Sequence, residues 1–197
     1  MRSAPWREVR SGREAVAAAH DLGFPLVVKA ADPAIVHKTE GRMVHTGVRN
    51  RRELFAAVRQ VQEATGPGSP VLVQQQLSGP EFAVGVVRDA RFGPLVMVAS
   101  GGVQLDLWGD QTYLMPPVGP ADVRTALQSL RTWPLLTGFR GSPPLDGDAV
   151  VELVRSVAEL ALDRPDVLEL DLNPVIVTET GPFCVDAKVR VRSADQL

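Results

Sequence analysis

Four polar side chains near the C-terminal end of the sequence have the types and spacing that suit a metal site. They are Asp171, Asn173, Asp186 and Lys188, within LELDLNPVIVTETGPFCVDAK at residues 168–188. Oxygen ligands from a few side chains, completed by phosphate oxygens and water, are how Mg²⁺ is held beside a nucleotide. We interpret Asn173 and Asp186 as magnesium ligands and Asp171 as a third, direct or through water. Lys188 would contact a phosphate or balance the acids.

A β-hairpin would bring these residues together. If Glu179–Pro182 is the connection, Asn173 lies opposite Lys188 and Val175 lies opposite Asp186. Alternation along the strands then places the polar residues on one face. The other face is apolar and contains Leu170, Leu172, Ile176, Val185, Ala187 and Val189. A structural alternative stays open, in which the polar face is solvated and its acids pair with Lys188.

Lysine is rare in this chain and occurs where chemistry is plausible. Of the 21 lysine and arginine residues, only Lys29, Lys38 and Lys188 are lysines. Lys29 closes the apolar run LVV, where a charge needs a partner or an opening at the end of the strand, and a phosphate is a natural partner. Lys38 follows His37 in a loop that is able to fold over a ligand. Alternatively, both lysines extend to solvent along the surface.

Three glutamines, Gln74, Gln75 and Gln76, end a strand that joins the two halves of the chain, and Glu81 begins the next strand. Amide side chains and free backbone groups are able to form hydrogen bonds with the edge of an adenine base, and a carboxylate accepts hydrogen bonds from ribose hydroxyls. Glutamines that serve only solubility are the simpler alternative.

The elements that position these residues indicate an α+β fold. Ser11 with Glu14, and Asn50 with Glu53, are capping boxes that open helices ending at Gly23 and Gly66. We expect residues 71–77, 82–88 and 95–100 to form an antiparallel meander, and residues 101–115 to be irregular. The remaining expected elements are strands 24–30 and 44–48, a loop over 31–43, helices 120–131 and 148–162, and the C-terminal hairpin.

Composition excludes several classes of protein. The 197 residues are 45% hydrophobic and 22% charged, as in an ordinary globular protein. A net charge of −2 argues against nucleic acid as the main partner. The apolar runs are far shorter than the roughly 20 residues of a spanning helix, so we expect no membrane partner. Cys184 is the single cysteine, and a cytoplasmic location is the default.

Taken together, these residues resemble the ATP-grasp domain of ADP-forming acyl-CoA synthetases (acetate–CoA ligases), which is related to the succinyl-CoA synthetase β subunit. Four segments carry the resemblance in the family's order across nearly the whole chain. They are GFPLVVKAADPAIVHKTE, VLVQQQLSGPEFAVGVVRDARFGPLVMVASGG, GFRGSPPLDGDAV and ELDLNPVIVTETGPFCVDAK.

The resemblance implies two α+β lobes with antiparallel sheets that clasp ATP or ADP with Mg²⁺, here residues 1–75 and 76–197, forming one functional unit without the family's first helix. It implies that Lys29 binds phosphate, that Gln74 and its neighbours contact adenine, and that Glu81 contacts ribose. It implies that Asn173 and Asp186 bind magnesium. His37, with Lys38, lies in a segment similar to the family's loop that carries a proposed second relay histidine.

The family's reaction passes a phosphoryl group through a histidine of a CoA-binding partner, then to an acyl phosphate, with an acyl-CoA thioester formed or consumed. The partners implied are therefore that CoA-binding domain or subunit and a small acyl substrate. This sequence departs from the family at Arg42 and Met43, where paired glycines are usual, and at Asp106 and Leu114, where glutamate and arginine are usual. These departures leave open a non-catalytic nucleotide-binding regulatory or scaffold domain associated with a protein acetyltransferase.

Overall fold

The computed structural model describes residues 1–31 and 43–192 of the chain, which divides into two compact units. The smaller unit is Ala4–Leu77. The larger unit combines Met1–Ser3 with Ser78–Leu197, so the first residues of the chain belong to the same unit as its C-terminal part. In the larger unit, Ser3 forms a parallel bridge with Cys184, and the Cys184 amide donates to the Arg2 carbonyl at 2.9 Å.

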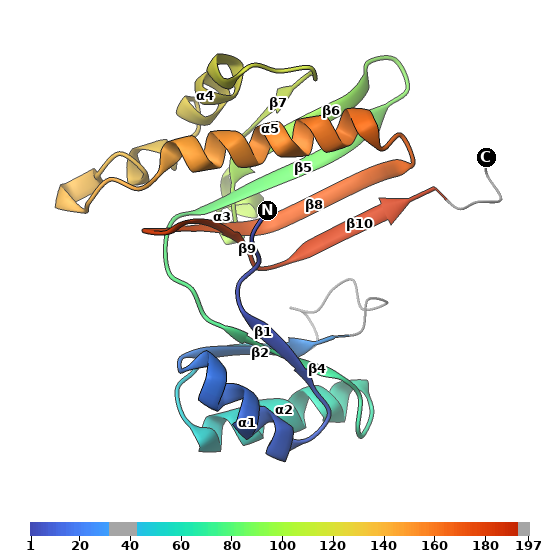
Figure 1. The fold of residues 1–197 in the computed structure, drawn as a ribbon, viewed down its shortest axis with the longest axis vertical. Helices are drawn as coiled ribbons and strands as arrows, with labels where there is room; N and C mark the ends of the chain where they lie inside the picture. Colours follow the sequence, from blue (N-terminus) through green and yellow to red (C-terminus); the bar gives the residue numbers. More distant parts are fainter. Residues whose placement is uncertain (32–42, 193–197) are drawn as a thin grey trace. The chain divides into compact units, whose positions relative to one another are not determined.

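The smaller unit is a four-stranded antiparallel sheet in the order β1-β4-β2-β3. Helices α1 and α2 lie on one face of it (Figure 1) and enclose its core with Leu26, Val28 and Val73. Both predicted N-caps are present, since Ser11 and Asn50 accept the backbone amides of Glu14 and Glu53. The reciprocal bond of a capping box is replaced, because the two glutamate carboxylates accept the backbone amides of the residues that precede the caps. The elements are β1 Trp6–Val9, α1 Gly12–Leu22, β2 Leu26–Ala30, β3 Val44–Val48, α2 Arg51–Thr65 and β4 Val71–Gln75.

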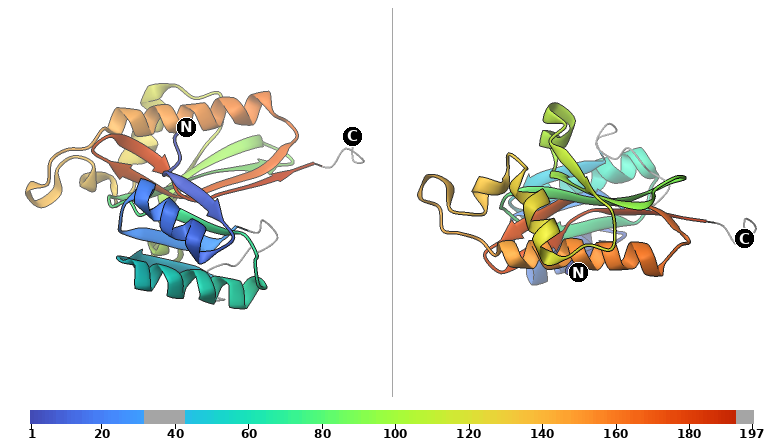
Figure 2. Two further views of the ribbon diagram at one scale, coloured as in Figure 1. Left: turned by 60° about the horizontal axis from the view of Figure 1, so that its bottom comes forward. Right: turned by 90° about the horizontal axis from the view of Figure 1, so that it is seen from above.

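The larger unit is an antiparallel sheet in the order β10-β8-β5-β6-β7, and β9 pairs with the end of β8. Helix α5 runs along one face of the sheet beside α4 (Figures 1 and 2), and their apolar stripes bury its core. The elements are β5 Glu81–Asp89, β6 Gly93–Ser100, α3 Val103–Trp108, β7 Gln111–Leu114, α4 Pro120–Gln128, 3₁₀ turns Trp133–Leu135 and Phe139–Gly141, α5 Gly147–Asp163, β8 Val167–Thr178, β9 Gly181–Cys184 and β10 Ala187–Val191.

Strand β8 has a bulge in the middle of the sheet. Leu172 pairs with Val84, but Val175 pairs with Phe82, so Asn173 and Pro174 together oppose the single residue between these partners. The inserted residue reverses the alternation of side chains. Leu170 and Leu172 belong to the core before the bulge, and Val175 and Val177 belong to it afterwards. The bulge therefore allows the apolar side chains in both halves of this twelve-residue strand to face the same core.

Two sequence-based expectations about these elements are wrong, and one strand was not predicted. Strands β4, β5 and β6 do not form a meander, because β4 pairs with β1 and β2 while β5 pairs with β6 and β8. Residues 101–115 are not irregular but contain α3 and β7. Strand β1 was not predicted, since WREV has no alternation of apolar and polar residues.

None of the helices in the described part of the chain has the length and apolar character that a membrane span requires.

Arg88 of β5 ties helix α5 to the sheet. Its Nη2 atom donates to the carbonyls of Ala161 and Arg164 at 2.6 and 2.7 Å, and its Nε donates to the Val167 carbonyl at 2.6 Å. Carbonyls at the end of a helix lack intrahelical partners, and a cation complements the negative end of the helix dipole. A single side chain thus donates hydrogen bonds to three backbone carbonyls at the end of α5 and in the turn that leads to β8.

We expect Arg88→Met to lower the free energy of unfolding by about 2–3 kcal/mol, because it leaves these carbonyls without their charged donor. In a chain of this size that corresponds to a fall in Tm of roughly 5–10 °C. Urea unfolding followed by circular dichroism measures the change. Arg91→Met, at an exposed arginine three residues along, is the matched control, and equal stability of the two variants would contradict the capping role.

Candidate functional site

The polar face of the C-terminal hairpin is present in a register two residues away from the expected one. Thr178 pairs with Gly181, so the connection is the two-residue turn Glu179–Thr180. Lys188 lies opposite Asp171, where Asn173 was expected. A shift by two residues keeps the side-chain alternation, so Asp171 and Lys188 still share a face.

The expected apolar face of the hairpin is only partly correct. Leu170 and Leu172 are buried in the core, but Ile176 lies outside the core cluster because the bulge at Asn173 reverses the alternation after it. Ala187 and Val189 are exposed, since β10 is an edge strand of the sheet.

Negative charge gathers around Asp171. Burial raises the pKa of its carboxyl, Lys188 opposes that rise, and the charges of Asp186 and Glu169 add to it. Asp171 and Asp186 are thus near enough to repel each other, and a cation bound there would relieve the repulsion. The donor set of two carboxylates and one amide suits Mg²⁺, which keeps several waters and phosphate oxygens of its own. Among the described residues, no cluster of three His, Cys, Asp or Glu side chains forms a metal site by itself.

Asn173 and Glu81 meet at a pair of glycines that follow β6. The Gly102 amide donates to Asn173 Oδ1 at 2.9 Å, and the Gly101 amide donates to the Glu81 carbonyl at 2.8 Å. The Glu81 carboxylate lies directly against Gly102. The candidate ribose carboxylate and the candidate metal-binding amide therefore lie on either side of one short turn.

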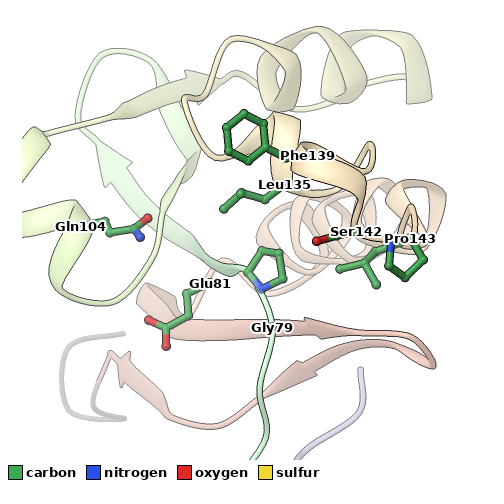
Figure 3. Close-up of a pocket in the computed structure, with 9 residues that line it drawn as sticks. Gly79, Glu81, Gln104, Leu135, Phe139, Ser142 and Pro143 are labelled. Atoms are coloured by element: carbon green, nitrogen blue, oxygen red, sulfur yellow. The ribbon is translucent and has the colours of Figure 1, made fainter.

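Glu81 also lines a pocket of about 570 Å³ within the larger unit (Figure 3). Its other walls come from the start of β5, from α3 and from the 3₁₀ turns before α5. The Oε1 atom of Gln104 is buried there without a hydrogen-bond partner in the structure. Burial raises the pKa of the Glu81 carboxyl. The lining residues are Gly79, Pro80, Glu81, Gln104, Leu135, Phe139, Ser142, Pro143 and Leu145.

In the smaller unit, Lys29 and Gln74 lie on the same face of neighbouring strands. Lys29 pairs with Leu72, and Gln74 pairs with Val27, two residues from Lys29. Leu26, Val28 and Ala30 point into the core, so alternation turns Lys29 to the opposite face of the sheet from the helices. Lys29 and Gln74 are only 8% and 4% exposed, which is unusual for these residue types.

The other two glutamines make backbone contacts within the smaller unit. The backbone amide of Gln75 donates to the Pro5 carbonyl at 2.9 Å. Gln76 Oε1 accepts the Gly47 amide at 2.6 Å, which holds the end of β3. Of the three, Gln76 thus has its side-chain oxygen engaged in the fold. His37, Lys38 and Arg42 lie outside the described residues.

Comparison with known proteins agrees with this arrangement of units and sheets. A family model described as "ATP-grasp domain" matches residues 1–191. The chain belongs to the ATP-grasp domain family. Its α+β architecture with two antiparallel sheets is the fold expected from that membership.

Individual relatives of this ATP-grasp chain are ADP-forming ligases. It is 30% identical to the β subunit of acetate–CoA ligase (ADP-forming) I of Pyrococcus furiosus, over 93% of this chain and 82% of that protein. It is 34% identical to acetate–CoA ligase (ADP-forming) I of Archaeoglobus fulgidus, over 94% of this chain but only 28% of that longer protein.

A solved structure of acetyl-coenzyme A synthetase 1 from Ca. Korarchaeum cryptofilum, in complex with coenzyme A and Mg-AMPPCP, has the same fold with a TM-score of 0.81 and 30% identity. The match covers 97% of this chain and 85% of that one. That structure is described with its phosphohistidine segment pointing towards the nucleotide-binding site.

Sequence reasoning gave no role to several residues around Glu81. Gly102 follows Gly101 at the end of the segment VASGG, and a glycine at the end of a strand often marks a close backbone approach. Leu135, Phe139 and Ser142 line the pocket from the segment WPLLTGFRGSPPLDG, whose glycines and prolines are typical of a loop. No periodicity links these loop residues to Glu81, so only the fold brings them together.

We expect Glu81→Gln to stabilise the larger unit at neutral pH. The pKa of Glu81 is raised, so its charged form is disfavoured in the folded state, and its stabilising contribution is lost as the pH rises through the folded pKa. The variant should therefore be more stable than the parent at pH 7. At a pH below the unfolded pKa of glutamate, where the parent carboxyl is neutral, the difference should disappear. Thermal unfolding across this pH range measures it, and an equal gain at all pH values would contradict the burial effect.

Proposed function

We propose that this chain is the Mg²⁺-nucleotide-binding domain or subunit of an ADP-forming acyl-CoA ligase. The observation that carries the proposal is the turn at Gly102, which brings the Glu81 carboxylate and the Asn173 amide together on the polar side of β8. Ribose hydroxyls need an acceptor, and a phosphate-bound Mg²⁺ needs oxygen ligands a short distance away. Asp171 and its neighbour Asp186 supply further oxygens on this face.

The residues have distinct proposed roles. Asn173 and Asp186 hold the metal, with Asp171 as a third ligand, direct or through water. Lys188, opposite Asp171, contacts a phosphate or balances these acids. Glu81 accepts hydrogen bonds from the ribose. A bound Mg²⁺ would shield the phosphate charge.

The two units correspond in this proposal to the lobes expected at residues 1–75 and 76–197. The smaller unit provides Lys29 for phosphate and Gln74, Gln75 and Gln76 for adenine. The buried position of Lys29 and Gln74, on the face of the sheet that points away from α1 and α2, supports these roles. The role of His37 and Lys38 in a phosphoryl relay stays a prediction.

The partner we propose is a CoA-binding domain or subunit that carries a phosphorylated histidine. The relative in Pyrococcus furiosus is named as a β subunit, and the archaeal relative in Archaeoglobus fulgidus is much longer than this chain. Both arrangements are consistent with a nucleotide-binding part that works with a further part. The phosphoryl group would pass from ATP to the partner's histidine, leaving ADP. It would then pass to a carboxylate oxygen of the acid, which frees the histidine and gives an acyl phosphate, from which the thiol of CoA displaces phosphate to form the thioester.

We expect the chain to bind ADP or ATP only in the presence of Mg²⁺, and Asp186→Asn to weaken that binding at least about tenfold, since metal-site changes of this kind typically cost 10–100-fold. Isothermal titration calorimetry measures both. Asp163→Asn, at an exposed acid ending α5, makes the same change in charge and should bind as the parent does. If neither nucleotide binds with Mg²⁺ present, or if Asp186→Asn binds as well as the parent, the proposal fails.

A second candidate is a nucleotide-binding regulatory domain without catalysis, of the kind associated with a protein acetyltransferase. Leu114, where the family usually has arginine, is partly buried and packs against the core of the larger unit. Met43, where the family usually has glycine, packs against the core of the smaller unit. Both positions contribute apolar packing and no charge to a transferring phosphoryl group.

Phosphoryl transfer distinguishes the two candidates. With radiolabelled ATP and a histidine-bearing CoA-binding partner, we expect label on the partner in the presence of this chain. Lys29→Ala should abolish the label, because its buried ammonium is the proposed phosphate contact in the smaller unit. Arg59→Ala, which removes an exposed cation paired with Glu63, should leave labelling unchanged. Nucleotide binding without any labelled partner would favour the regulatory candidate.

A further inference from the structure

Gly101 and Gly102, the glycine pair after β6, make backbone contacts with two residues of the proposed nucleotide site. Gly101 continues the ladder beyond β6, with its amide on the Glu81 carbonyl. Gly102 then reaches across the start of β5 to β8 and donates its amide to Asn173 Oδ1 at 2.9 Å. Asn173 stands at the β8 bulge, where the regular pairing with β5 is interrupted.

The hydrogen bond fixes which way the Asn173 carboxamide points. A backbone N–H is only a donor, so the group facing Gly102 has to be the amide oxygen, and the NH₂ group is turned away. An amide oxygen has two lone pairs. Gly102 uses one of them, which leaves the second on the same, now oriented, oxygen for a cation.

Neither glycine has space for a side chain. A Cβ atom on Gly102 would overlap the Glu81 carboxylate, and one on Gly101 would lie 2.5 Å from the Phe82 carbonyl oxygen. Gly102 also has φ 61° and ψ −147°, a conformation open essentially to glycine alone. The backbone can therefore approach Asn173 and Glu81 at once only because both side chains are absent.

We propose that Gly101–Gly102 is a positioning element of the nucleotide site. It orients the Asn173 oxygen toward the metal and limits where the Glu81 carboxylate can lie, so the metal and ribose contacts are set by one turn. The inference rests on the proposed function and adds to it a residue, Gly102, that acts through Asn173 and needs no contact with the nucleotide itself. Partners that orient a metal ligand typically contribute 10–100-fold to metal affinity.

The test compares Gly102→Ala with Gly23→Ala in the full chain. Gly23 has φ 73° and ψ 155°, and a Cβ atom there would meet nothing within 4 Å, so it provides a similar backbone strain without the neighbours. Both variants should lose stability in thermal unfolding. Only Gly102→Ala should raise the Mg²⁺ concentration needed for half-maximal ADP binding, by about 10- to 100-fold. In an Asn173→Ala background, Gly102→Ala should have little further effect on that concentration, because the two residues act as a unit.

A second measurement does not depend on the folding of Gly102→Ala. In ¹⁵N-labelled protein, the Gly102 amide should shift on addition of Mg²⁺ and ADP. In Asn173→Ala it should move upfield and exchange faster with solvent, while the Gly23 amide, bonded to the Ala19 carbonyl, should stay unchanged.

The outcomes separate this inference from the proposed function. A parent chain that binds no Mg²⁺-nucleotide rejects the proposed function. A parent that binds, together with a Gly102→Ala variant whose Mg²⁺ requirement equals that of Gly23→Ala, rejects only the positioning role. A Gly102 amide that is the same in the parent and in Asn173→Ala rejects it as well.

Discussion

The pairing of β5 with β8, and the bulge that interrupts it, is the constraint on which the larger unit depends. A strand with one buried face has to keep its apolar residues on that face along its whole length. The bulge at Asn173 and Pro174 changes the alternation once, so that Leu172 and Val175 both reach the core of α4 and α5. The same irregularity removes Asn173 from regular pairing and makes its side chain available to Gly102.

The packing of the core on one face of the sheet therefore determines where the polar residues on the other face lie. The core holds β5 and β8 in place, and Arg88 fixes the end of α5 where it leads into β8. Around Asp171, the sheet concentrates negative charge in a partly buried position, which is unfavourable for folding and favourable for a cation. Perturbed carboxyl groups of this kind are typical of functional sites, although structural ion pairs also produce them.

Evidence for nucleotide binding and evidence for catalysis differ in this chain. Membership of the ATP-grasp family and the geometry at Glu81 and Asn173 support binding. Catalysis stays a prediction, because the segment around His37 lies outside the described residues and Leu114 packs, partly buried, against the core of the larger unit.

The sequence by itself determined most of the local elements, but not β1, α3 and β7, and it determined the polar face of the hairpin. Capping boxes at Ser11 and Asn50 and a period-two alternation are short-range signals, and a two-residue error in register left Asp171 and Lys188 on the same face. Tertiary structure alone decided which strands pair, where β8 bulges and that Gly102 meets Asn173. Those contacts join residues far apart in the chain, and at least one partner in each is a backbone group. Because backbone groups are the same at every position, no pattern of residue types records these contacts.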